Sequence, residues 1–273
     1  MERIQRALEL AHVRRAVEIE SPLAGHGSHE ERAMLRAAAQ PAEATELPRL
    51  SIDRANLRAR KVVFPEEATA AARAYRMLRA QLLHRARSSG LSAIGMVSSA
   101  SGEGKTLTAV NLALSLAADP NQKVTLIDLD LRRPAVAETL GITPPLGLET
   151  WLTGEYPVAS ALYGLEGVER LTVVPTLAPL VAASEALAGS KTRDLLDTLR
   201  TMDGRRLLIV DLPPALLSDH VLTASSLLDG FVLLVAEGKT LRDDVERVFE
   251  LLGRDRILGT VLNRSSDSEQ RAY

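Results

Sequence analysis

The residues of this 273-residue chain best suited to do chemistry lie in the segment SSASGEGKT, residues 98–106. Two glycines, a lysine and a threonine follow an apolar run and precede a helical pattern. The N–H groups of such a loop and the positive end of the next helix favour a bound phosphate. The spacing is that of G-x-x-x-x-G-K-[ST], except that Ser99 occupies the first glycine position. The segment predicts a site for nucleotide phosphates, whereas the alternative is a turn with a surface lysine.

Each residue type in this loop suits one part of a nucleotide. Gly102 and Gly104 allow the backbone to approach the phosphate oxygens, because no Cβ intervenes. Lys105 can reach the β- and γ-phosphates, and the hydroxyl of Thr106 is placed to bind Mg²⁺. The nucleotide-binding residues predicted here are Ser101, Gly102, Glu103, Gly104, Lys105, Thr106 and Leu107.

Carboxylates end two further apolar runs. The stretch TLIDLDLRRP carries Asp128, Asp130, Arg132 and Arg133, and the stretch RLLIVDLPP carries Asp211. One aspartate at the end of a strand usually caps the next helix. Two such strands beside a phosphate loop are harder to explain structurally, and they predict carboxylates that organise Mg²⁺.

Short Val/Ile/Leu runs alternate with amphipathic stretches from about residue 64 onward. Six strands are predicted, at residues 93–98, 123–130, 171–176, 206–213, 230–236 and 257–264. Continuous apolar strands separated by helices indicate an α/β fold, with a doubly wound, mostly parallel sheet covered by helices on both faces. Ligands of such sheets lie beyond the carboxyl ends of the strands, where the residues above fall.

The first 60 residues differ in composition from the rest. A short helix is predicted at residues 2–19, followed by a Pro-, Gly-, Ser- and Ala-rich linker. Residues 61–273 then form the nucleotide-binding domain with a short C-terminal tail, and a helix is expected to open at Pro65.

Composition excludes several classes of protein. The formal charge of -2 gives no electrostatic footprint for nucleic acid. The chain has no cysteine, which excludes disulfides and thiolate metal sites and suits a reducing cytoplasm. The longest clean apolar run, FVLLVA at 231–236, is too short to span a bilayer, and the first residues do not resemble a signal peptide.

The segments SGEGKT, LIDLDLRRP and LIVDLPP together resemble the Walker A, Walker A′ and Walker B motifs of bacterial tyrosine autokinases. These kinases act in exopolysaccharide and capsule synthesis and belong to the MinD- and ParA-type P-loop ATPases. The resemblance covers roughly residues 65–265 and is most specific in the aspartate-x-aspartate-x-arginine order of the second motif.

The resemblance implies a role for each matching residue, with ATP and Mg²⁺ as cofactors. Lys105 would hold the phosphates, and Thr106 would ligate Mg²⁺. Asp128 would be the base or orienter for the attacking phenol and also a metal ligand, with Asp130 and Asp211 organising the metal and its waters. Either Arg132 or Arg133 would offset charge on the transferring group. Asn263 and Arg264 match the place where related ATPases contact adenine.

Two departures from the family pattern leave alternatives open. Members usually end in a run of tyrosines, whereas this chain has Tyr273 alone, which is either a minimal phosphoacceptor or an ordinary tail residue. Members also carry a Glu-x-x-Arg-x-x-Arg helix motif that joins subunits in a ring. Here Arg73 replaces the glutamate before Arg76 and Arg79, with Glu66 or Glu67 as a possible compensation. A homo-oligomer is expected, but its ring form is in question.

The resemblance also implies a partner and a location. The activator would be a membrane protein of the polysaccharide chain-length or co-polymerase type, which would hold this chain, cytoplasmic and without its own span, at the inner face of the cell membrane. Two alternatives remain. One is a MinD- or ParA-type ATP switch or scaffold, although Ala100 stands where that branch carries a lysine. The other is an ATP-binding regulatory module with little or no kinase turnover.

Overall fold

The computed structural model describes residues 47–154, 156–202 and 206–265 of the chain. The helix predicted at residues 2–19, the linker after it and Tyr273 lie outside these described residues. Those three predictions therefore stay predictions.

The compact unit that contains the sheet begins at Leu47, before the boundary expected at residue 61. β1 (Arg49–Leu50) pairs with a strand of the sheet, and Leu57 of α3 (Arg54–Ala59) is only 1% exposed. The pairing of β1 and the burial of Leu57 attach the segment to the domain, although its short elements give no clear periodic signal.

The described residues form an eight-stranded sheet with the order β1-β4-β5-β3-β6-β2-β7-β8. The remaining strands are β2 (Ala93–Ser98), β3 (Lys123–Asp128), β4 (Tyr163–Leu165), β5 (Val168–Val174), β6 (Arg206–Asp211), β7 (Gly230–Ala236) and β8 (Ile257–Asn263). Neighbouring strands are parallel except for β4 and β5. The doubly wound, mostly parallel sheet is confirmed, and the short strands β1 and β4 are additions to the prediction.

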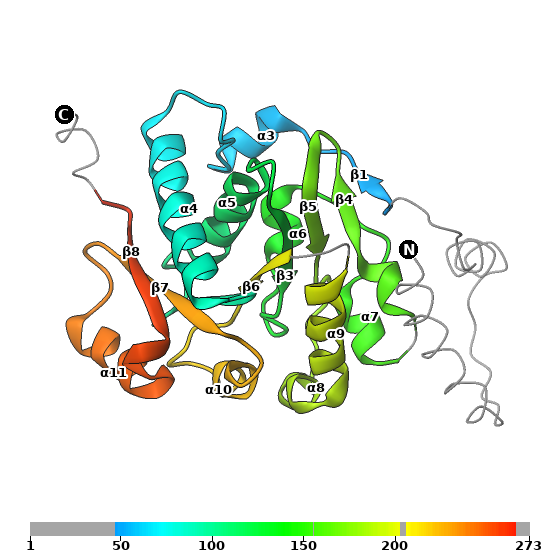
Figure 1. Ribbon diagram of the computed structural model, residues 1–273. Coiled ribbons are helices and arrows are strands. Elements are labelled where there is room, and N and C mark those ends of the chain that lie inside the picture. Colours follow the sequence, from blue (N-terminus) through cyan, green and yellow to red (C-terminus); the bar gives the residue numbers. More distant parts are fainter. Residues whose placement is uncertain (1–46, 155, 203–205, 266–273) are drawn as a thin grey trace, which may run out of the picture. The chain divides into compact units, whose positions relative to one another are not determined.

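Helices cover both faces of this sheet (Figure 1). They are α4 (Ala70–Ser89), α5 (Lys105–Ala117), α6 (Val136–Leu140), α7 (Leu148–Leu152), α8 (Ala183–Ala188), α9 (Ser190–Thr201), α10 (His220–Ser225) and α11 (Arg242–Leu252), in addition to α3. Successive side chains of each strand point to opposite faces. In β6, for example, Leu207 and Ile209 enter the core under α4 and α5, whereas Leu208 and Val210 enter the core under α9 and α10.

The parallel order brings the ends of distant strands together. Asp128, the last residue of β3, is the register partner of Asp211, the last residue of β6. Met96 of β2, two residues before the end of that strand, pairs with Asp211 on the other side. Both carboxylates therefore lie at the carboxyl edge of the sheet, beside the loop that follows β2.

The helix expected from Pro65 begins later, at Ala70. Thr69 is its N-cap and accepts a hydrogen bond from the backbone N–H of Ala72. A threonine side chain satisfies one of the free N–H groups of the first helical turn, which the two glutamates after Pro65 do not do here. Residues 65–67 instead form a turn, closed by the bond from Glu67 N to Phe64 O.

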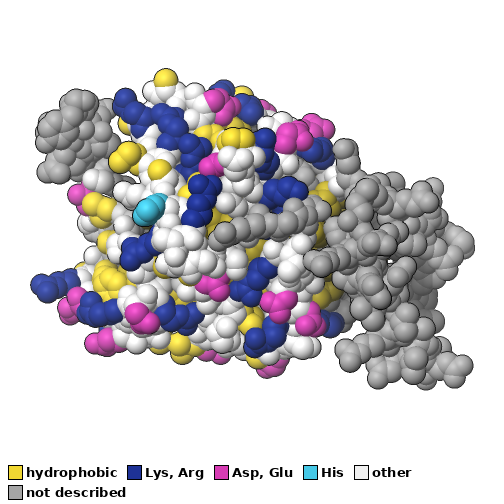
Figure 2. Space-filling view, in the orientation of Figure 1, with side chains coloured by type: hydrophobic (Ala, Val, Ile, Leu, Met, Phe, Trp, Pro, Cys, Tyr) yellow, Lys and Arg dark blue, Asp and Glu magenta, His cyan; other side chains and the backbone are white. Residues whose placement is uncertain are grey.

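α4 carries five arginines and no acidic residue, and Lys and Arg side chains gather over it in the space-filling view (Figure 2). Of the arginines at positions 73, 76 and 79, the first is exposed and the other two are half-buried. Arg76 donates to the carbonyl oxygens of Pro65 and Glu67, and Arg79 donates to that of Ser115. The side chain of Arg73 is exposed, and its guanidinium makes no hydrogen bond or ion pair within the described part of the chain.

The two glutamates considered as compensation for Arg73 have other partners. Glu66 pairs with Arg54 at 2.5 Å, and Glu67 pairs with Arg58 at 2.7 Å. Both contacts lie within this chain and tie α3 to the turn before α4. Ring formation stays a prediction.

Asp229, just before β7, ties that strand to the start of β2 and provides a test of stability. Its Oδ2 accepts the N–H groups of Ser92 and Ala93 at 2.6 and 2.8 Å and the hydroxyl of Ser92 at 2.9 Å. Burial alone would raise the pKa of Asp229, but these N–H groups lower it below the ordinary value of 3.8. We expect Asp229→Asn to lower the free energy of unfolding at pH 7 by about 1 kcal/mol, a modest figure because the side chain is half-buried.

The sign of the pH dependence follows from the direction of the shift. A carboxyl group whose pKa is lower in the folded chain stabilises it above the unfolded-chain value, and this contribution is lost as the pH falls through the folded value. The difference between wild type and variant should shrink below pH 4 in urea unfolding, and a constant difference would contradict the assignment. Asp197→Asn is the matched control, since Asp197 is 60% exposed and its ion pair with Arg200 is worth little.

Candidate nucleotide-binding site

The loop between β2 and α5 has the geometry of a phosphate cradle. Gly102 and Gly104 have φ angles of 75° and 95°, in the left-handed region that favours glycine. A Cβ on Gly104 would lie 2.1 Å from Nδ2 of Asn263. Because α5 begins at Lys105, directly after the loop, the positive end of its dipole lies at the cradle. The predicted order of strand, loop and helix is confirmed.

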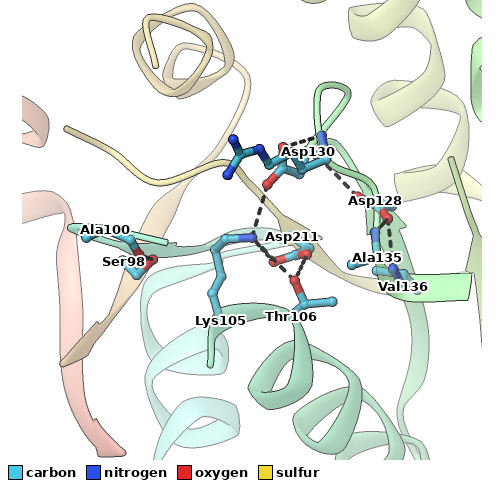
Figure 3. Close-up of polar contacts among 10 residues, drawn as sticks. Ser98, Ala100, Lys105, Thr106, Asp128, Asp130, Ala135, Val136 and Asp211 are labelled. Carbon is cyan, nitrogen blue, oxygen red and sulfur yellow. Dashed lines mark hydrogen bonds and ion pairs between the residues drawn. The ribbon is translucent and has the colours of Figure 1, made fainter. Parts of the chain in front are cut away.

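Lys105 lies in a buried ion-pair cluster at the carboxyl edge of the sheet (Figure 3). Its Nζ is 2.9 Å from Oδ1 of Asp211 and 3.6 Å from Oδ2 of Asp130. Burial alone would lower the pKa of Lys105, but these two carboxylates raise it above the ordinary value. The lysine therefore stays protonated and places a positive charge beside the loop.

Thr106 and Asp211 together provide oxygen ligands suited to Mg²⁺. The hydroxyl of Thr106 donates to Oδ2 of Asp211 at 2.6 Å, next to the lysine contact on Oδ1. Asp128 and Asp130 add two more acidic side chains near this lysine, so a divalent cation would meet a site rich in oxygen ligands. No group of three or more acidic or histidine side chains in the described residues could hold a metal ion by itself. Proteins hold Mg²⁺ through one or two carboxylates, substrate phosphates and water.

Asp128 has a different environment from the one expected for a base that contacts substrate. It is completely buried, and its carboxylate accepts the backbone N–H groups of Asp130, Ala135 and Val136 at 3.0 to 3.2 Å (Figure 3). Burial first, and then the charge of Asp211, raise the pKa of Asp128 well above its ordinary value. In this conformation Asp128 holds the loop after β3, while Asp130 of the same loop pairs with Lys105.

Arg132 and Arg133 are exposed on that same loop. Among the described residues, neither guanidinium makes a hydrogen bond or ion pair, whereas the backbone N–H of Arg133 donates to Asp130. Two guanidinium groups without a described partner therefore lie within three residues of Asp130, which pairs with Lys105.

The remaining predicted nucleotide-binding residues support the loop or the helix after it. Nδ2 of Asn263 donates to the carbonyl of Glu103, and Nη2 of Arg264 donates to that of Gly102, both at 2.8 Å. Their side chains thus contact the phosphate loop in this structure, and a contact with adenine stays a prediction. Ser101 is exposed, and Leu107 packs against the core under α4 and α5.

Sequence reasoning missed two residues that also contact the phosphate loop, Lys239 and Thr240. Nζ of Lys239 donates to the carbonyl of Ser101 at 2.6 Å, and the hydroxyl of Thr240 contacts the carboxylate of Glu103. The sequence contains a feature that predicts this contact. Both residues follow the predicted strand 230–236, so they are expected at the same edge of the sheet as the phosphate loop.

The glycine-rich loop, the lysine at the start of its helix and the carboxylates at the neighbouring strand ends define a P-loop nucleotide-binding protein. A ParA family model described as "NUBPL iron-transfer P-loop NTPase" matches residues 91–270. Tyrosine-protein kinase CpsD of Streptococcus agalactiae is 31% identical over 171 residues, which are 61% of this chain and 72% of that protein.

Two further similarities agree. Tyrosine-protein kinase YwqD of Bacillus subtilis is 27% identical over 201 residues, 73% of this chain and 83% of that protein. The crystal structure of the VpsO kinase domain superposes with a TM-score of 0.64 at 29% identity, covering 72% of this chain and 96% of that one. The chain belongs to the ParA-type P-loop NTPases and, within them, to the family of bacterial tyrosine-protein kinases.

Proposed function

We propose that this chain is an ATP- and Mg²⁺-dependent protein tyrosine autokinase that regulates exopolysaccharide or capsule polymerisation and export. The observation that carries the proposal is the buried cluster of Lys105, Thr106 and Asp211, with Asp130 beside it, at the phosphate loop. The similarity to CpsD and YwqD, both named tyrosine-protein kinases, supports tyrosine as the acceptor.

In this proposal Lys105 changes partner when nucleotide binds. Its ammonium leaves Asp211 for oxygens of the β- and γ-phosphates, while the loop N–H groups hold the remaining phosphate oxygens. The Thr106 hydroxyl and Asp211 would hold Mg²⁺, which would supply positive charge to offset the negative charge of the phosphates. The carboxylate that the lysine leaves thereby stays paired with a cation.

The transfer step forms a bond between the tyrosine oxygen and the γ-phosphorus. The bond from that phosphorus to the β–γ bridging oxygen breaks, and ADP leaves with the electron pair. A loose transition state needs the phenol proton removed only late, so orientation matters more than base strength. We propose Asp130 as the carboxylate that orients the phenol and takes its proton, with Arg132 offsetting charge on the transferred group. Asp128 would fix the loop that carries both residues.

An ATP-driven switch of the MinD or ParA type is the second candidate. The match to a ParA family model favours it. Against it, Ala100 occupies the position at which that branch carries the lysine that reaches into a partner subunit. The kinase proposal is preferred because the named relatives CpsD and YwqD are kinases.

We further propose that a membrane polysaccharide co-polymerase activates this chain and holds it at the inner face of the membrane. Within the described residues, no helix is both long enough and apolar enough to cross a bilayer. The proposed activator and the membrane location rest on the resemblance to the kinase family. We propose on the same ground that the chain forms a homo-oligomer.

The proposal is tested with the full chain, γ-labelled ATP and Mg²⁺, with and without the cytoplasmic tail of a co-polymerase. Mass spectrometry locates the label, and Tyr273→Phe is run in parallel. We expect phosphotyrosine at Tyr273 that disappears in the variant. Phosphate release without phosphotyrosine would favour the switch, and label confined to another tyrosine would keep the kinase but reject Tyr273.

A further inference from the structure

Three consecutive carbonyl groups of the phosphate loop each accept a hydrogen bond from a distant side chain. Lys239 donates to Ser101 O at 2.6 Å, Arg264 donates to Gly102 O at 2.8 Å, and Asn263 donates to Glu103 O at 2.8 Å. These three donors, two of them cations, come from the segments at the ends of β7 and β8. Each of these three carbonyl groups is therefore held by a side-chain donor.

The carboxylate of Glu103 holds the same loop from inside. Glu103 is 1% exposed and accepts the hydroxyl of Ser99 at 3.0 Å and the N–H of Ala100 at 3.0 Å. It also accepts the hydroxyl of Thr240. Thr240 Oγ1 itself accepts the N–H of Ala236 at 2.9 Å. The hydroxyl of Thr240 is therefore the donor to Glu103 and the acceptor from Ala236.

These contacts fix the direction of the N–H groups in the loop. In a planar trans peptide the C=O and N–H point in opposite directions. Holding the carbonyls of residues 101–103 toward Lys239, Arg264 and Asn263 therefore turns the following N–H groups toward the space a phosphate would occupy. Cations at the carbonyl end also polarise these peptides, which strengthens their N–H groups as donors to an anion.

We infer that Lys239 and Thr240 are positioning residues, which set the affinity for nucleotide phosphates by ordering the phosphate loop. The inference rests on nucleotide binding in the proposed function. It also explains Ser99, because the hydroxyl at the position of the first glycine supplies a bond to Glu103 that a glycine cannot make.

The main test removes one donor at a time from the full chain. Lys239→Met and Thr240→Val should each raise the Kd for ADP, measured by calorimetry, about tenfold, as expected for one oriented hydrogen bond to a charged or polarised group. KM for ATP should rise with Kd, while kcat changes less than about twofold, because neither residue contacts the transferred group. Lys239→Arg and Thr240→Ser keep the donors and should restore the Kd.

A matched control separates loop ordering from loss of a lysine contact in general. Lys191 donates to the carbonyl of Leu152 at 2.9 Å, in a contact made by residues outside the phosphate loop. Lys191→Met should leave the Kd for ADP unchanged. If Lys239→Met and Thr240→Val also leave it unchanged while wild type binds ADP, the inference is overturned and the proposed function stands. If wild type binds no ADP, both are overturned.

Restoring the consensus glycine gives an independent result. Ser99→Gly should weaken ADP binding about threefold to tenfold instead of improving it, because Glu103 loses a donor. Combined with Thr240→Val, its effect should be non-additive, since both hydroxyl groups bind the same carboxylate. Tighter binding by Ser99→Gly, or strict additivity of the two changes, would contradict the role of Glu103 as the shared acceptor.

Discussion

Lys105→Met is expected to weaken ATP binding and to lower turnover by about 100-fold or more, because the variant lacks the only buried cation described beside the phosphate loop. Methionine keeps the length of the side chain and fills the same space. Phosphotyrosine should disappear together with nucleotide turnover. Calorimetry with ADP and labelling with γ-labelled ATP measure the two effects separately.

The same variant should also change the pH dependence of stability. Without Lys105, Asp211 keeps its burial, which raises the pKa of that carboxyl, and loses the nearest charge that lowers it. A carboxyl group with a raised folded pKa costs stability as the pH rises toward that value. The stability lost on substitution should therefore be smaller at pH 5 than at pH 7. Retained phosphotyrosine, or normal ADP affinity, would reject the central assignment.

Asp211→Asn is expected to separate nucleotide binding from its dependence on Mg²⁺. In the wild type a nucleotide without metal must draw Lys105 away from Asp211, which leaves a fully buried carboxylate unpaired. The neutral amide removes that cost. Affinity for ADP in EDTA should therefore rise severalfold, while the gain in affinity on adding Mg²⁺ should fall at least about tenfold, because a metal ligand is lost.

Turnover of Asp211→Asn should fall, as should the gain in ADP affinity on adding Mg²⁺, even though the affinity for ADP in EDTA rises. Calorimetry in EDTA and in Mg²⁺ gives both affinities from one preparation. Asp197→Asn is the control, since that exposed carboxylate pairs with Arg200 instead of Lys105. Weaker ADP binding by Asp211→Asn in EDTA would show that Asp211 does not hold the lysine away from the nucleotide.

The sequence was sufficient to predict the core strands and the phosphate loop. Residues 93–98 and 230–236 have the same bounds in the structure, because long buried Val/Ile/Leu runs have few alternatives to a parallel strand. The Lys105–Asp211 contact also follows, since both residues end or follow parallel strands at one edge.

Other features could not be predicted because they depend on contacts between distant segments. β4 has three residues and takes its antiparallel direction from pairing with β5. The orientation of Asp128 depends on N–H groups freed by a turn that the sequence pattern does not specify. The sequence pattern does not single out Thr69 as the N-cap, because Pro65 and the glutamates after it give a competing start signal.

The donors on the outside of the phosphate loop have a consequence for how the site is acquired during folding. Lys239, Asn263 and Arg264 are separated from their carbonyl partners by 138 to 162 positions in the chain. Contacts of such long sequence separation form late and slowly, because a long loop must close first. As the ribosome synthesises this chain, the phosphate loop emerges well before the strands that complete it. With these donors as the groups that order the loop, as inferred above, we expect competence to bind nucleotide only after β8 has joined the sheet.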